Sequence, residues 1–207
     1  MKLNKVLLVL NGTLNKQFLA ETAAKYPFIL AADGGANKCL KAGVMPSAVV
    51  GDLDSITAKN KTILQGRLKQ ISRQDNSDFE KALDYLKTNK AKQVDIILAF
   101  GGRIDFSFSN FFAASNYLKY FDIRFLLPKA TIYLLSKSAK IKTQKNTRVS
   151  LVALEEIKNI STKNLVYPLK NEPLHLGQRG LSNIANGDFS IKFSRGKLLV
   201  YTENYTN

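Results

Sequence analysis

The N-terminal part of the chain alternates between short apolar runs and segments with helical spacing, and this alternation leaves few possible folds. Continuous apolar runs of this length are typical of strands that are buried on both faces of a sheet. We expect such strands at residues 6–10, 28–32, 48–50, 94–100 and 123–127. We expect helices between them, near residues 18–24, 57–66, 79–86 and 109–120. This alternation predicts a mostly parallel, Rossmann-like α/β sheet that is covered by helices.

The pattern changes after Pro128, where short strands follow one another and no amphipathic helix is evident. Strands are expected at residues 131–135, 147–154, 189–193 and 198–201, with a hairpin turn at Ser194-Arg195-Gly196-Lys197. This half is predicted to be an antiparallel β-sandwich. We therefore expect two domains, an α/β domain at residues 1–128 and a β domain at residues 129–207.

Composition excludes several classes of protein. No apolar run is long enough to span a bilayer, so no membrane partner is expected. The net charge of +15 is spread along the chain without a dense block of Lys or Arg, which favours a solvated basic surface over a nucleic-acid groove. The single cysteine excludes an internal disulfide, and a cytoplasmic location is expected.

Two aspartates stand directly after an expected buried strand, in Gly51-Asp52-Leu53-Asp54-Ser55. Residues i and i+2 of a strand point to the same side, so Asp52 and Asp54 can converge on one point. Two like charges held together cost free energy unless a cation lies between them. Mg²⁺ suits carboxylate oxygens and usually brings substrate phosphates with it. The alternative for this stretch alone is an ordinary turn.

Two more loops follow expected strands and carry charged residues beside paired glycines. Asp33 precedes Gly34 and Gly35, which permit close backbone approach, and the next helix would offer free amides to an anion. Arg103 follows the second glycine pair and could clamp a phosphate with its planar guanidinium group. The alternatives are a tight turn at Asp33 and a surface ion pair between Arg103 and Asp105.

The start of the helix expected at residues 79–86 is also acidic. Ser77 or Asp78 is expected to cap this helix, with Glu80 in its first turn. We assign capping to Ser77 and site chemistry to Asp78. Acidic residues thus gather in loops that are expected at one edge of the sheet, and they are Asp33, Asp52, Asp54, Asp75, Asp78 and Asp105. This pattern predicts a metal–phosphate site.

Five short segments, taken together, resemble motifs of the thiamine pyrophosphokinase family. They are Asp33-Gly34-Gly35-Ala36-Asn37, Gly51-Asp52-Leu53-Asp54-Ser55, Gln74-Asp75-Asn76-Ser77-Asp78-Phe79, Gly101-Gly102-Arg103-Ile104-Asp105 and Gly180-Leu181-Ser182-Asn183. The resemblance covers most of the chain. It implies a homodimer in which an α/β nucleotide-handling domain is joined to a C-terminal β-sandwich. It also implies transfer of a diphosphate group from ATP to the hydroxyl of thiamine, giving thiamine diphosphate and AMP.

The same resemblance implies a role for each matching residue. Asp52, Asp54 and Asp78 would hold Mg²⁺ on the ATP phosphates, Arg103 would stabilise charge on the transferred group, and Asp105 would support that site. The phosphate and nucleotide pocket would be completed by Asp33, Gly34, Gln74, Asp75 and Ser77. Ser182 and Asn183 would hydrogen-bond the aminopyrimidine of thiamine, across the dimer interface. No general base is assigned, and Asp78 and Asp105 are candidates.

The chain departs from the family pattern at Phe106, where many relatives have histidine, and this leaves the local substrate contacts open. The chain has no tryptophan, so an aromatic partner for thiamine would be Tyr167 or Tyr201. Two alternative functions remain. One is a pyrophosphokinase of the same fold acting on another hydroxymethyl heterocycle, such as a reduced pterin, and the other is a basic RNA-binding protein.

Overall fold

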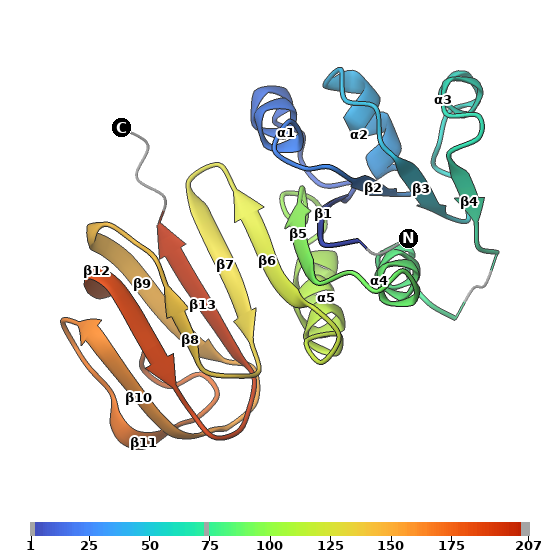
Figure 1. Cartoon of the computed structure of the whole chain (residues 1–207). Coiled ribbons are helices and arrows are strands. Elements are labelled where there is room, and N and C mark those ends of the chain that lie inside the picture. Colours follow the sequence, from blue (N-terminus) through green and yellow to red (C-terminus); the bar gives the residue numbers. More distant parts are fainter. Residues whose placement is uncertain (1–2, 73–74, 204–207) are drawn as a thin grey trace. The chain divides into compact units, whose positions relative to one another are not determined.

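The computed structural model describes residues 3–72 and 75–203. The chain divides into two compact units, Met1–Leu126 and Leu127–Asn207. The predicted fold class is confirmed, because the strands are parallel in the first unit and antiparallel in the second (Figure 1). No helix among the described residues is both long enough and apolar enough to cross a membrane.

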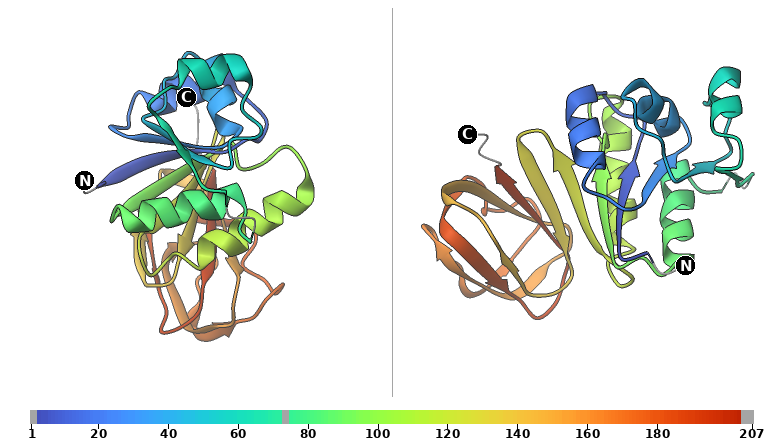
Figure 2. Two further views of the ribbon diagram at one scale, coloured as in Figure 1. Left: turned by 90° about the vertical axis from the view of Figure 1, so that its right-hand side faces the viewer. Right: turned by 45° about the horizontal axis from the view of Figure 1, so that its top comes forward.

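The first unit is built on six parallel strands in the order β4-β3-β2-β1-β5-β6. The strands are β1 (Lys5–Val9), β2 (Ile29–Ala32), β3 (Ala48–Gly51), β4 (Leu68–Gln70), β5 (Gln93–Ile97) and β6 (Asp122–Leu127). Helices α1 (Lys16–Ala23), α2 (Gly35–Lys41) and α3 (Ala58–Ile63) cover one face, and α4 (Asp78–Thr88) and α5 (Ile104–Ser115) cover the other (Figure 2). Since both faces are covered, the strands are apolar throughout, as their sequences predict.

The strand order reverses direction at β1. The chain runs from β1 to β2 on one side, whereas β5 pairs with the other side of β1. Sheets of this kind bind ligands in the crevice beyond the carboxyl ends of the strands where the order reverses. The fold therefore points to the loops after β1, β2 and β5 as the place for a site.

The second unit contains only antiparallel strands among its described residues. They are β7 (Ala130–Leu135), β8 (Ala139–Ile141), β9 (Lys145–Ala153), β10 (Ile157–Leu165), β11 (Lys170–Leu174), β12 (Asn183–Lys192) and β13 (Leu198–Glu203). Their order is β11-β10-β12-β9-β13-β7, and β8 also pairs with β12. Alternate residues of these strands form a separate apolar core that includes Leu151, Ile160, Phe189 and Val200.

Two predictions of local structure are wrong. Residues 194–197 do not form a hairpin turn, because β12 and β13 are not neighbours and β9 lies between them. Helix α5 begins at Ile104, well before the predicted residue 109, and Arg103 is its N-cap. The acidic side chain of Asp105 therefore lies in the first turn of α5, where it interacts favourably with the helix dipole.

Candidate active site

The end of β3 lies close to the residue that follows β2, because Gly51 has no side chain. Asp33 follows β2, and its backbone N–H donates a hydrogen bond to the Val50 carbonyl at 2.8 Å. Gly51 has a φ of +156°, and a Cβ atom added there would lie only 2.8 Å from Cβ of Asp33. The absence of a side chain at Gly51 therefore allows Asp33 to lie against the end of β3.

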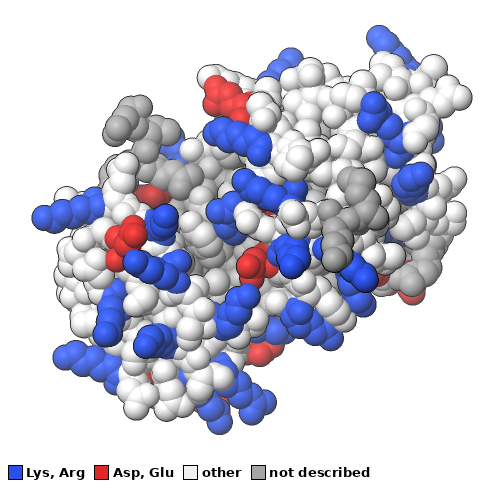
Figure 3. Space-filling view, viewed as in Figure 1, with Lys and Arg blue, Asp and Glu red and all other residues white. Residues whose placement is uncertain are grey.

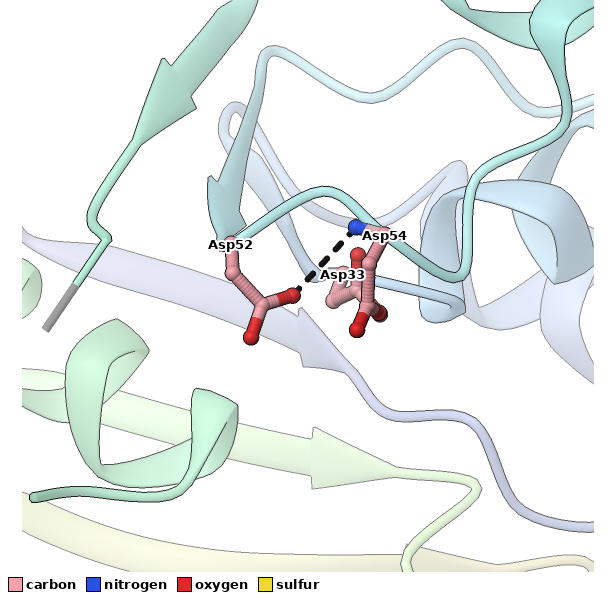
Figure 4. A group of neighbouring side chains, drawn as sticks. All are labelled: Asp33, Asp52 and Asp54. Carbon is pink, nitrogen blue, oxygen red and sulfur yellow. Dashed lines mark hydrogen bonds between the residues drawn. The ribbon is translucent and has the colours of Figure 1, made fainter. Parts of the chain in front are cut away.

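Three carboxylates converge at this point. One oxygen each of Asp33, Asp52 and Asp54 lies within 4.8 Å of the others (Figure 4). The Asp54 backbone N–H donates to Oδ1 of Asp52 at 3.3 Å, and the Ser55 hydroxyl donates to Oδ1 of Asp54 at 3.0 Å. We refer to Asp33, Asp52, Asp54 and the neighbouring Asp78 as the acidic group.

The electrostatics of the acidic group favour a bound cation. Oδ1 of Asp33 is buried and has no hydrogen-bond partner among the described residues. Burial raises the pKa of Asp33, and the charges of Asp78 and Asp52 raise it further, against a lowering hydrogen bond from Ser55. A buried carboxylate oxygen without a donor is costly, and a hard cation with oxygen ligands would satisfy it. The donor set, which consists of oxygens alone, fits Mg²⁺.

Asp78, the fourth member of the acidic group, is the first residue of α4. Its Oδ1 accepts hydrogen bonds from Nζ of Lys81 at 2.9 Å and from the Asp52 backbone N–H at 3.3 Å. Lys81 also contacts Oδ2 of Asp52 at 3.4 Å. Partial burial alone would raise the pKa of Asp52. The hydrogen bond from the Asp54 backbone and the charge of Lys81 outweigh this effect, so the pKa of Asp52 is lowered overall.

The capping role predicted for Ser77 is confirmed. Its Oγ accepts from the Glu80 backbone N–H at 3.3 Å, and the Ser77 backbone N–H donates to Glu80 Oε2 at 3.0 Å. This capping box fixes the start of α4 and with it the position of Asp78. Asp75 is exposed in the loop before α4, and Gln74 lies outside the described residues.

A cavity of about 440 Å³ adjoins the acidic group, at the crevice indicated by the strand order. The predicted site residues that line it are Asp33, Gly34, Ser77, Asp78 and Arg103. Its lining also includes Phe106, which the sequence analysis singles out as a departure from the family pattern, and Asn11, Gly12, Phe100 and Asn110, which the sequence analysis does not assign to the site. Asn11 and Gly12 could have been found, because they follow the first apolar run as Asp33 and Gly34 follow the second.

Arg103 and Asp105 form the surface ion pair that the sequence left open as an alternative. The guanidinium Nε and Nη2 lie 3.2 Å and 2.6 Å from the two carboxylate oxygens of Asp105. The guanidinium carbon also lies 4.8 Å from the ring centroid of Phe106. Arg103 lines the cavity although its side chain is 74% exposed, so a phosphate role for this residue stays a prediction.

Comparison with known families assigns both parts of the chain. The model described as "Thiamin pyrophosphokinase, catalytic domain" matches residues 19–126, which is more than half of the chain. The model described as "Thiamin pyrophosphokinase, vitamin B1 binding domain" matches residues 138–198. The chain belongs to the thiamin pyrophosphokinase family. Membership gives it the activity of a thiamine pyrophosphokinase, as the resemblance of its motifs predicts.

Solved structures of thiamin pyrophosphokinases share the fold. The enzyme from Bacillus subtilis is 22% identical with a TM-score of 0.86, and the match covers 98% of this chain and 100% of that one. The enzyme from Candida albicans is 20% identical with a TM-score of 0.84, covering 98% and 90%. The yeast enzyme is 17% identical with a TM-score of 0.75, covering 99% and 87%. Sequence comparison with curated proteins gives no match.

The two residues predicted to contact thiamine lie in the segment that matches the thiamin pyrophosphokinase B1-binding model. Ser182 is exposed and has a φ of +57°. Asn183 is buried, and its side chain bonds the backbone of Tyr167 twice, accepting at 3.1 Å and donating at 2.7 Å. Asn183 thus fixes the loop that carries the exposed Tyr167, next to the exposed Ser182. Tyr201, the other aromatic candidate, lies half-buried within β13.

Proposed function

We propose that this chain transfers a diphosphate group from Mg²⁺-bound ATP to the hydroxyl of thiamine, releasing AMP and thiamine diphosphate. The observation that carries the proposal is the acidic group with its unpartnered Asp33 oxygen, beside a cavity of about 440 Å³. Cavities of this size accommodate small ligands such as a nucleotide. Family membership supplies thiamine as the acceptor.

Mg²⁺ would be held by Asp52, Asp54 and Asp78, with Asp33 as a fourth carboxylate. The bound ion would neutralise charge on the phosphate oxygens and polarise the group that is transferred. The protein's own contribution is position. The capping box sets Asp78, the close approach at Gly51 sets Asp33, and backbone hydrogen bonds set Asp52.

The remaining cavity residues would bind and orient the nucleotide. The resemblance to the family implies that Gly34, Gln74, Asp75 and Ser77 complete the nucleotide pocket. Arg103 would donate to the transferred phosphates, since a guanidinium group binds phosphate bidentately, and Asp105 would hold Arg103 until then. Diphosphoryl transfer depends on positioning and charge neutralisation more than on a strong base. We assign no general base, and Asp78 and Asp105 remain the candidates.

Thiamine would bind at Ser182, on a segment fixed by Asn183. We propose that the chain forms a homodimer and that thiamine bound at this segment accepts the diphosphate from ATP in the site of the second copy. Exposed apolar side chains support an interface, because isolated proteins rarely gather them. Phe106, Phe108 and Phe112 on α5 are 53–59% exposed, and Tyr167 of the second unit is 68% exposed.

We place the enzyme in the cytoplasm and assign it no nucleic-acid or membrane partner. Lys and Arg side chains are scattered over the face shown in Figure 3 rather than gathered in one block.

Replacing Ser182 with alanine is expected to raise the thiamine KM and leave the ATP KM unchanged. The loss of one hydrogen bond to the uncharged aminopyrimidine group of thiamine corresponds to roughly a three- to tenfold weaker interaction. Steady-state kinetics with each substrate varied in turn measure this effect. Ser190→Ala is the matched control, because Ser190 lies on β12, the strand that follows Ser182. An unchanged thiamine KM in Ser182→Ala would count against the pocket.

Product analysis tests the proposed reaction. The purified protein is incubated with ATP, Mg²⁺ and thiamine, and the products are separated by chromatography and identified by phosphorus NMR. We expect thiamine diphosphate and AMP in equal amounts, and none in excess EDTA. ADP as the product would mean single-phosphate transfer and would refute the proposed reaction. AMP release with a pterin alcohol, and none with thiamine, would move the function to the alternative substrate.

A further inference from the structure

A lysine ammonium group lies against the acidic group from inside the protein. The side chain of Lys81 is only 2% exposed, and its Nζ contacts Oδ1 of Asp78 at 2.9 Å and Oδ2 of Asp52 at 3.4 Å. Lysine is almost never fully buried unless it is paired. The cap of α4 does not require it, because Ser77 and Glu80 complete the capping box. Its place is therefore explained by the two carboxylates.

The contacts of Lys81 divide the oxygens of these carboxylates into two sets. Lys81 occupies Oδ1 of Asp78 and Oδ2 of Asp52. Oδ1 of Asp52 instead accepts from the Asp54 backbone. Oδ2 of Asp78 makes no hydrogen bond within the described part of the chain. Asp52 is thus held through both of its oxygens, whereas Asp78 is held through Oδ1 alone and keeps Oδ2 available to a ligand.

The charges in this region are unbalanced without a metal ion. Asp33, Asp52 and Asp54 lie close together with Asp78 beside them, and Lys81 is a buried cation that contacts Asp52 and Asp78. Like charges at this spacing repel one another, and a nearby cation offsets part of that cost. Removing the cation from such a group leaves carboxylates uncompensated, which is strongly destabilising when they are partly buried.

We propose that Lys81 is a positioning residue that acts as an internal counter-cation, holding Asp52 and Asp78 in place before the metal binds. The inference rests on the proposed Mg²⁺ site and adds the residue that keeps this site formed when it is empty. It follows that Lys81 and a divalent ion oppose each other electrostatically. Loss of the ammonium group should make the protein depend more on the metal and bind it more tightly.

The test compares Lys81→Met, which removes the charge from a side chain of similar length, with Lys87→Met on the exposed side of the same helix. The Tm is measured in EDTA and in saturating Mn²⁺, and Mn²⁺ affinity is measured by electron paramagnetic resonance without nucleotide. We expect the Tm of Lys81→Met to fall more in EDTA than in Mn²⁺. We expect Mn²⁺ to bind about three- to tenfold more tightly, because a nearby positive charge is gone. The kcat should fall with little change in either KM, and Lys87→Met should behave as wild type.

A purely structural role for Lys81 predicts something different. Lost packing would lower the Tm equally in EDTA and in Mn²⁺ and would leave the Mn²⁺ affinity unchanged, and this result would overturn the proposal. The double variant Asp78→Asn/Lys81→Met removes one carboxylate together with the cation, so it should regain stability in EDTA even if Lys81→Met alone fails to fold. A double variant as unstable as Lys81→Met would also overturn it.

The wild-type protein separates this inference from the proposed function. If its Tm and its Mn²⁺ binding show no response to the ion, the metal site itself is refuted, and the role of Lys81 with it. If the wild type responds to Mn²⁺ and Lys81→Met responds equally, the metal site stands and only the role of Lys81 is refuted.

Discussion

Asp52→Asn is expected to lower kcat by about 10²–10³-fold, the loss that follows removal of one preorganised electrostatic group from an active site. Asparagine keeps the size of the side chain and can still accept the hydrogen bond from the Asp54 backbone. It removes the charge that faces the proposed metal and one of the two carboxylate partners of Lys81. Asp54→Asn is expected to have a similar effect. Turnover is measured at saturating Mg²⁺ by following AMP.

The control for Asp52→Asn is a variant of an acidic residue that has no part in the proposed site. Glu21 lies exposed on α1, where it accepts a hydrogen bond from Gln17, so Glu21→Gln should retain full activity. Circular dichroism and the Tm show whether the fold is retained in each variant. Normal turnover of either aspartate variant at saturating Mg²⁺ would remove that residue from the metal site.

Asp95→Ala is expected to lower the free energy of unfolding by about 3–5 kcal/mol, the usual cost of removing one partner from a buried ion pair. Asp95 is 0% exposed on β5, and both of its oxygens bind Arg124 of β6, at 2.6 Å and 2.7 Å. The side chains of Tyr26 and Gln93 also donate to it. Burial, together with Asp95, raises the pKa of Tyr26. The variant would leave several partly buried donors without their acceptor.

Urea denaturation measures this loss, with Glu155→Ala as the control. Glu155 forms an exposed ion pair with Lys197 at 2.8 Å, and such pairs contribute about 0–1 kcal/mol. The two variants remove the same kind of contact in buried and exposed settings. Equal stability losses in both would contradict the central structural role that we assign to Asp95.

The sequence predicts the strands of the first unit well because they are buried on both faces and therefore continuously apolar. The same rule fails for β4, where Leu68, Lys69 and Gln70 form a short edge strand without an apolar run. It also fails for β10 and β11, whose alternating and polar residues reflect one exposed face and local register shifts. Periodicity alone cannot find such strands.

The sequence predicts which residues belong to the candidate site better than it predicts which of them contact one another. Asp33 was expected in the nucleotide pocket, but the structure brings it among Asp52 and Asp54 because Gly51 lets two strands approach. Asp78 was expected among the metal ligands, and the structure adds its pairing with Lys81. Lys81 was missed because a lysine on the apolar face of a helix shows its purpose only once its partners are known.

The position of β1 in the sheet has a consequence for how the protein is made. β1 is synthesised before both of its neighbours. β2 follows it directly and pairs with one side, whereas the other side pairs with β5, at Gln93–Ile97. An apolar strand with an unpaired edge is prone to association with other chains, and pairing between distant segments is slow. This edge of β1 therefore lacks its native partner until β5 has left the ribosome. The crevice into which ATP would bind lies between the ends of β1 and β5, so it forms only after β5 has paired with β1.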